Sequence, residues 1–176
     1  MGDPAAKLVV APVMLLHGFT DARRRYESAA RPPSVGPEPT FKPLFEALNW
    51  CVALDDRLQA WWKVNATNRD RRWCDGFRFG ETVLGTRYAR NRVHHQWADA
   101  LWFSLSAPLR PGGPPRGPEW RWRPSTQLPD ANKGHAWNRS QYDATLAGHP
   151  ARDTLVHVQE CFAEALSAGL GHPALG

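Results

Sequence analysis

Apolar positions recur along this chain with the period of α-helices, and no segment shows a convincing strand pattern. The pattern begins in 14–30, where apolar side chains return every three or four residues. They are Leu15, Phe19, Ala22 and Tyr26. Because this spacing places them on one face, it predicts a first helix that packs that face on a core.

The stretch 31–39 is rich in proline and is predicted to be a linker, because proline cannot continue the helix before it. A second helix is predicted over 40–62, with Thr40 as its cap. Its apolar stripe contains one acid and consists of Leu44, Leu48, Cys51, Asp55, Leu58 and Trp62. A carboxylate among apolar neighbours is costly unless it is paired. We therefore expect Asp55 to have a cationic or hydrogen-bond-donating partner, and Asp56 to face water.

Three segments complete the middle of the chain. Residues 63–80 read as a polar, basic loop, and a central helix is predicted from 81 to about 105. Residues 106–135 are rich in proline and glycine and are predicted to form a long loop or a small hairpin. Within them, "EWRWRP" alternates aromatic and basic residues as a short extended piece does.

The C-terminal part adds a short helix that ends at Gly148 and a last helix that starts at Pro150. The stripe of the last helix is Leu155, Val158, Phe162 and Leu166. Together the helices predict an all-α, up-and-down helical bundle, in one domain over 1–176, with the long loop or hairpin inserted between its last helices.

Composition narrows the class of protein. The net charge is +5, and the only lysines among 22 basic residues are Lys7, Lys42, Lys63 and Lys133. Arginine suits contact with phosphate, so a nucleic-acid partner is permitted, although a GC-rich genome explains the same bias. The three cysteines are isolated and predict neither a disulfide framework nor a zinc site, which favours a reduced, cytoplasmic setting. The apolar run 8–16 is shorter than the roughly 20 residues that span a bilayer, so no membrane association is expected.

Two basic stretches interleave arginine with aromatic residues. Arg71 and Arg72 lie in the first, and Arg121 and Arg123 in the second. This arrangement is typical of proteins that bind single-stranded RNA, whose bases stack on rings while arginines hold phosphates. The alternative is solvated loop charge, with the tryptophans folded onto the core.

The central helix carries the most informative polar residues. At about 100° per residue, its solvent-facing strip is expected to be Gly85, Arg92, Gln96 and Asp99. Arg87, Arg90 and His94 project between two apolar stripes on the other side and are placed for a cleft or an interface. We expect Arg87 and His94 to support a site there. Since apolar or functional residues surround most of this helix, it is also expected to form a homodimer interface.

Within "RNRVHH", Arg90, Asn91 and His95 resemble the signature of the HEPN superfamily. In these helical bundles an arginine followed directly by a polar residue precedes a histidine by four to six intervening residues. The resemblance covers this helix and, more weakly, 41–62. It implies a ribonuclease that needs no metal or cofactor, acts in toxin or phage-defence settings, and completes its site by dimerisation; other members have lost catalysis. An antitoxin or a defence-system protein is the partner it implies.

Histidine and arginine suit such chemistry. RNA carries its own nucleophile, the 2′-hydroxyl, so cleavage needs a proton carrier near neutral pKa and a cation to stabilise the phosphorane. We expect His95 to fill the first role and Arg90 the second, with Asn91 orienting the phosphate or the histidine. Asp55 is expected to hold Arg90 or His95 in place. Metal binding is not expected, because His94 and His95 are adjacent and point apart.

A second match to the motif, Arg152 and His157 with Asp153 after the arginine, is a rival. His157 shares its helix face with Asp153, Glu160 and Glu164, a negative surface that repels phosphate. A non-catalytic alternative also stands. In it the polar groups of the central helix form a satisfied buried network that only sets helix packing, and the chain is a helical interaction protein.

Overall fold

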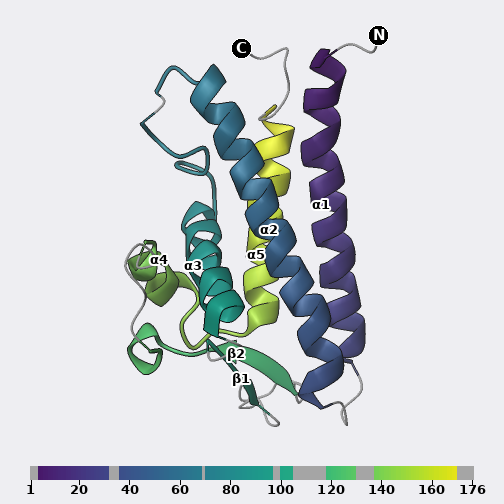
Figure 1. The fold of residues 1–176 in the computed structure, drawn as a ribbon, viewed down its shortest axis with the longest axis vertical. Helices are drawn as coiled ribbons and strands as arrows, with labels where there is room; N and C mark the ends of the chain where they lie inside the picture. Colours follow the sequence, from purple (N-terminus) through teal and green to yellow (C-terminus); the bar gives the residue numbers. More distant parts are fainter. Residues whose placement is uncertain are drawn as a thin grey trace, which may run out of the picture.

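A computed structural model describes residues 4–31, 36–68, 70–96, 100–104, 118–129 and 137–169, without the side chains of 4–11, 95 and 96. The helices are α1 Pro4–Ala29, α2 Pro37–Asn65, α3 Gly80–Gln96, α4 Arg139–Thr145 and α5 Ala151–Ser167. They form an up-and-down bundle with a small sheet at one end (Figure 1). The prediction of a mainly α-helical bundle is therefore confirmed. No described helix has both the length and the apolar character that crossing a membrane requires.

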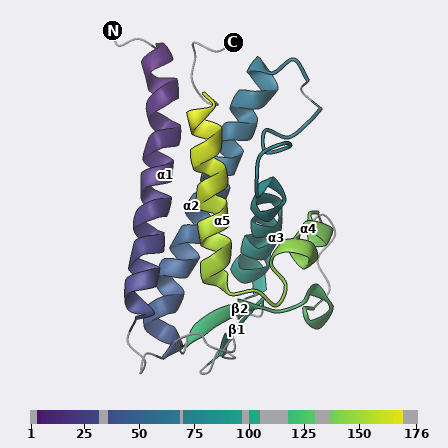
Figure 2. The ribbon, with the colours of Figure 1, turned by 180° about the vertical axis from the view of Figure 1, so that it is seen from behind.

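α1 and α2 form a long antiparallel pair, with α5 against both and α3 on the other side of α2 (Figures 1 and 2). The pair approaches closely at Gly18, where a Cβ atom would lie 2.8 Å from the Trp50 ring. Rings fill the centre: Phe162 meets Phe19 edge-on at 6.2 Å and stacks on Trp73 at 5.5 Å. These aromatic contacts join α1, α5 and the loop before α3 into one core.

α2 begins at Pro37, inside the stretch predicted to be a linker, so the boundary at 39 is wrong. Proline fits the first turn of a helix because the amide N–H it lacks has no partner there. Thr40 is not the cap: its hydroxyl donates to the Pro37 carbonyl over 2.8 Å and accepts from the Trp120 indole over 2.9 Å. Residues 32–35 of the predicted linker lie outside the described residues.

α3 ends at Gln96, and the prediction of a helix to about 105 is wrong there. Strand β1, Leu101–Ser104, pairs antiparallel with β2, Glu119–Trp122. The "EWRWRP" segment is thus extended as predicted, but its partner precedes 106–135, most of which lies outside the described residues. In a short segment whose side chains suit a strand, pairing with a distant strand decides whether the segment becomes strand or helix.

The strip of α3 predicted to face water comprises Gly85, Arg92, Gln96 and Asp99. For the first two the prediction is wrong, because α4 covers Gly85 and the segment before α4 covers Arg92. A Cβ atom at Gly85 would lie 2.8 Å from the Leu146 side chain, and Arg92 is only 3% exposed, donating to the Pro129 carbonyl. The other two side chains lie outside the described ones. α2, α4 and α5 all contact α3 within one chain. The apolar residues around α3 therefore give no reason to expect a homodimer interface on this helix.

Candidate functional site

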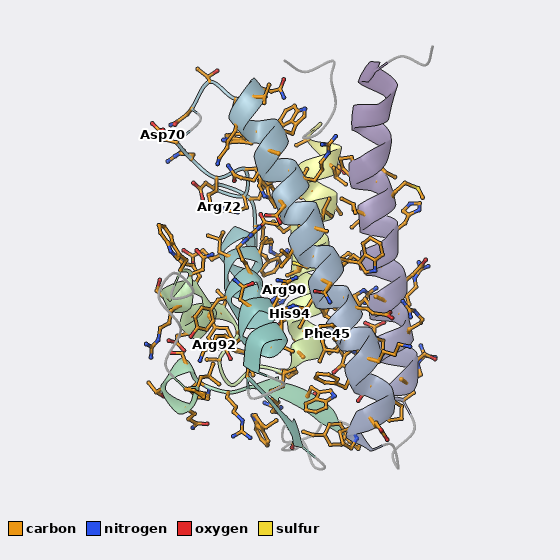
Figure 3. The ribbon with its side chains drawn as sticks, viewed as in Figure 1. Phe45, Asp70, Arg72, Arg90, Arg92 and His94 are labelled. Carbon is orange, nitrogen blue, oxygen red and sulfur yellow. The ribbon has the colours of Figure 1, made fainter. Side chains whose placement is uncertain are left out.

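Side chains of α2 and α3 meet in pairs along the line where these helices touch. We call this line the α2–α3 seam. Its pairs are Asp56 with Arg87, Asn49 with Arg90, and Phe45 with His94. The helices run antiparallel, so residues that rise in number along α3 meet residues that fall in number along α2. Figure 3 shows Arg90, His94 and Phe45 between the two helices.

Asp55 lies beside the seam and is 1% exposed. Its carboxylate accepts from Arg87 Nε over 2.7 Å, from Arg72 over 3.0 and 3.1 Å, and from the Trp73 indole over 2.7 Å. The expected cationic partner is therefore present. The expected pairing of Asp55 with Arg90 is wrong, because Arg72 and Arg87 occupy both carboxylate oxygens. The side chain of His95 lies outside the described ones.

Arg87 forms ion pairs with the carboxylates of Asp55 and Asp56. Burial works against its charge, but Asp55 and Asp56 outweigh that effect and raise the pKa of the guanidinium above its ordinary value. Arg87 thus remains charged and paired. It acts with Asp55 as an internal anchor between α2 and α3 rather than as a group open to a ligand.

Arg90 has a different environment. Its Nε donates to Asn49 Oδ1 over 3.1 Å, and its Nη1 donates to Asn91 Oδ1 over 3.3 Å. Asn49 donates its own amide to the Phe45 carbonyl over 3.0 Å, which turns its oxygen toward the arginine. No carboxylate among the described residues lies within ion-pair distance of Arg90. Two neutral amides therefore hold a half-buried guanidinium, and they leave its charge and several of its five N–H groups for an anion.

His94 follows Arg90 by one helical turn, so the two lie on the same face of α3. It is exposed and stacks on Phe45, with ring centroids 6.0 Å apart and planes within 8°. Of the predicted site, the seam thus brings together Arg90, Asn91 and His94. The backbone of His95 belongs to α3, one position further on.

The arginines predicted to bind RNA lie elsewhere. Arg72 is bound to Asp55, and Arg121 pairs with Glu119 over 2.5 Å and donates to the Gly148 carbonyl. Arg71 is exposed and Arg123 half-buried. The neighbouring tryptophans, Trp73, Trp120 and Trp122, are all buried. These rings therefore fold onto the core, as the alternative expects, and the small accessible part of Trp120, 8% of the residue, lines a hollow at the start of α2.

The rival motif on α5 has an acidic neighbour, Glu27 of α1, which is not one of the acids expected beside it. Arg152 is exposed and lies 4.0 Å from a Glu27 carboxylate oxygen. His157 stacks on Phe79 at 4.0 Å between ring centroids, with planes within 4°. Arg152 therefore already has an anion at hand, unlike Arg90.

Sequence reasoning missed Asn49 and Phe45. Both lie on the edge of α2 that also carries Asp56, at spacings of four and seven residues that keep them on one side of the helix. This edge borders the apolar stripe, so a polar residue there was a signal for a neighbouring helix with hydrogen-bond donors.

The seam offers a held cation beside an imidazole, an arrangement that can bind an anion and move a proton. Among the described residues no group of three or more histidine, cysteine, aspartate or glutamate side chains is arranged to hold a metal ion. Comparison of the chain with protein-family models, with curated proteins and with solved structures found no match.

Proposed function

We propose that this chain is a metal-independent endoribonuclease of the HEPN type that cuts single-stranded RNA. One observation carries the proposal: two asparagine oxygens hold the guanidinium of Arg90, and no described carboxylate neutralises it. The same helix supplies the histidines. From the resemblance to the HEPN signature, and not from the packing of α3, we further propose a cytoplasmic toxin or phage-defence effector that acts as a homodimer and is held in check by an antitoxin or another defence-system protein.

In the proposed reaction the 2′-hydroxyl oxygen attacks the adjacent phosphorus and gives its proton to a histidine. The 5′-oxygen of the next nucleotide leaves and takes a proton. The products carry a 2′,3′-cyclic phosphate and a 5′-hydroxyl. Arg90 stabilises the extra negative charge of the phosphorane, and Asn91 orients the arginine or the phosphate. His95 carries the proton, as the motif implies, and His94 lies beside Arg90 on the seam.

Asn49 supports this assignment because it positions Arg90 from a second helix. A catalytic cation must hold its place to within a fraction of an ångström, and a single hydrogen bond from its own helix would leave Arg90 free to swing. The bond to Asn49 ties it to α2. Arg87 lies one helical turn before Arg90 on α3, and its bond to Asp55 holds α2 against α3.

The test is cleavage of an unstructured RNA by the purified protein in EDTA, with the product ends identified. We expect 2′,3′-cyclic phosphate ends and no cleavage of DNA, which lacks the 2′-hydroxyl. Arg90→Ala and His95→Ala should each lower the rate by about 10²-fold or more, the usual loss when such a group is removed. The same cleavage assay with His94→Ala shows which of the two adjacent histidines, His94 or His95, carries the proton.

Arg152→Ala and His157→Ala are the matched controls, since they remove the same residue types from the rival motif. Both should cut RNA at the rate of the parent protein. Melting temperatures for all variants separate lost chemistry from lost fold. An essential His157 with a dispensable Arg90 would overturn the assignment of the site.

A second candidate is a non-catalytic helical interaction protein. The observation that favours it is the Asp55 cluster, whose buried carboxylate is fully hydrogen-bonded and whose arginines are consumed in packing. On this reading the whole seam sets helix geometry. Absence of RNA cleavage, together with unchanged binding of RNA by Arg90→Ala, would favour this candidate.

A further inference from the structure

A row of aromatic rings leads from the seam to the end of the bundle that carries the sheet. His94 stacks on Phe45 at 6.0 Å, Phe45 on Phe41 at 6.2 Å, and Phe41 meets Trp120 at 5.6 Å. Phe103 closes the row against Trp120 at 5.2 Å. Each step lies in the range of direct ring contact. Phe41 and Phe45 are half-buried, so both residues remain partly accessible to solvent.

The row borders a shallow hollow of about 600 Å³ that is largely open to solvent. Its lining is Gly36, Pro37, Glu38, Pro39, Phe41 and Trp120. The Trp120 indole N–H is already bonded to Thr40, so this ring meets the hollow as an apolar surface. Prolines and rings thus form the walls, and among the described lining residues Glu38 is the one with a charged side chain. This is the composition of a small-molecule site, apolar with a few polar groups that fix orientation.

We propose that this hollow binds one base of a single-stranded RNA, stacked on Phe41, while the phosphates outside it run toward Arg90. The proposal rests on the proposed function. A base has a flat apolar face that suits ring and proline walls, and stacking on an aromatic side chain is worth about 1–3 kcal/mol. The described residues of the lining include no cation, and Glu38 repels phosphate. The nucleotide therefore enters base first and leaves its phosphate to the arginine of the seam.

Glu38 also sets which base is preferred. A carboxylate accepts two N–H bonds at once, and the Watson–Crick edge of guanine presents two adjacent N–H donors. Uracil offers one donor between two carbonyl oxygens, which the carboxylate repels. The hollow should therefore favour guanine over uracil.

The probes are the four ribonucleoside monophosphates, which have no phosphodiester to cut, so binding is measured independently of cleavage. The readout is the indole N–H resonance of Trp120 in 15N NMR spectra. The Trp120 resonance should shift at a lower concentration of GMP than of the other nucleotides. The resonance of Trp137, which is 77% exposed on the turn before α4, should not shift as nucleotide is added. Phe41→Leu keeps the apolar bulk and removes the ring. It should weaken GMP binding by at least about fivefold, as the lower limit of a stacking contact implies.

Glu38→Gln is the second variant, and because Glu38 is exposed its replacement leaves the core intact. It should reduce the preference for GMP over UMP. Trp137→Leu is the matched control and should change neither quantity. Equal binding of ribose 5-phosphate, which has no base, would overturn the proposal, as would unchanged binding by folded Phe41→Leu.

The two proposals fail separately. RNA cleavage by a protein whose Trp120 signal ignores all four nucleotides would refute the base site and keep the ribonuclease. GMP binding that Phe41→Leu weakens, in a protein that cuts no RNA, would keep the base site and refute the ribonuclease.

Discussion

At the scale of residues, Asp55 shows how one carboxylate ties three parts of the chain together. It sits in the apolar stripe of α2, and its partners come from the loop before α3 and from α3 itself. The bonds to Arg72, Trp73 and Arg87 satisfy a charge that would otherwise be costly in the core. The neighbouring Asp56 contacts Arg87 as well, but its side chain is 62% exposed.

This difference predicts unequal effects of the same substitution. Asp55→Asn leaves Arg72 without its counter-charge and Arg87 with only the exposed Asp56, and it turns an amide N–H toward their donors. It should lower the free energy of unfolding by about 3 kcal/mol, the lower part of the range for a broken buried pair, because both arginines keep some contact with water. Asp56→Asn should cost less than about 1 kcal/mol. Urea denaturation measures both, and equal losses would contradict the role assigned to Asp55.

At the scale of elements, the short helix α4 shapes the site although it contributes no residue to it. It packs on α3 at Gly85, where Leu146, Thr145 and Tyr142 all lie within 3.1 Å of the place a Cβ atom would occupy. α4 therefore covers the back of α3 and leaves the seam as its accessible side. Glycine is required here for close approach rather than for its backbone angles.

Gly85→Ala is predicted to destabilise the protein, although alanine favours helices by about 1 kcal/mol over glycine. The added methyl group meets the Leu146 and Thr145 side chains and the Tyr142 backbone, and overpacking of this kind costs about 1–3 kcal/mol. Leu146→Ala in the same chain should relieve part of the clash, so a double-mutant cycle should show favourable coupling. A higher melting temperature for Gly85→Ala alone would show that the helices are not in such close contact.

At the scale of the whole molecule, the core holds three free thiols, Cys51, Cys74 and Cys161. Burial raises the pKa of Cys74 to about 11 and that of Cys161 to about 12. It raises the pKa of Cys51 well above its ordinary value too. The folded protein thus keeps protons that the unfolded chain releases at lower pH.

Stability should therefore fall as the pH rises from about 9, the ordinary thiol value, through the folded values of about 11 and 12. In this window the unfolded state binds fewer protons, and each thiol lowers the free energy of unfolding by at most about 1.4 kcal/mol per pH unit. The measurement is urea denaturation between pH 8 and pH 10.5. Other groups also titrate in this range, so the control is Cys74→Ala, whose curve should be flatter. If the free energy of unfolding falls equally steeply with pH in Cys74→Ala and in the parent protein, the raised pKa of Cys74 is contradicted.

The sequence by itself determined the features that depend on near neighbours along the chain. The spacing of apolar residues in α2 and α5 predicts both helices and their buried faces, because helical periodicity is a local property. The burial of Asp55, and its need for a donor, follow from its place in that stripe. The acids that share a helix face with His157 are also visible in the order of residues, whereas Glu27 beside Arg152 comes from α1.

Only the tertiary structure decided which groups meet. Asp55 finds its partners 17, 18 and 32 residues away, and Arg90 finds Asn49 41 residues away. Such pairings depend on how the connecting segments bring helices together, which no local pattern encodes. The same cause ended α3 early, where β1 could pair with β2, and covered Gly85 with α4. The aromatic row and its hollow arise for this reason as well, since their rings come from α2, α3 and the sheet.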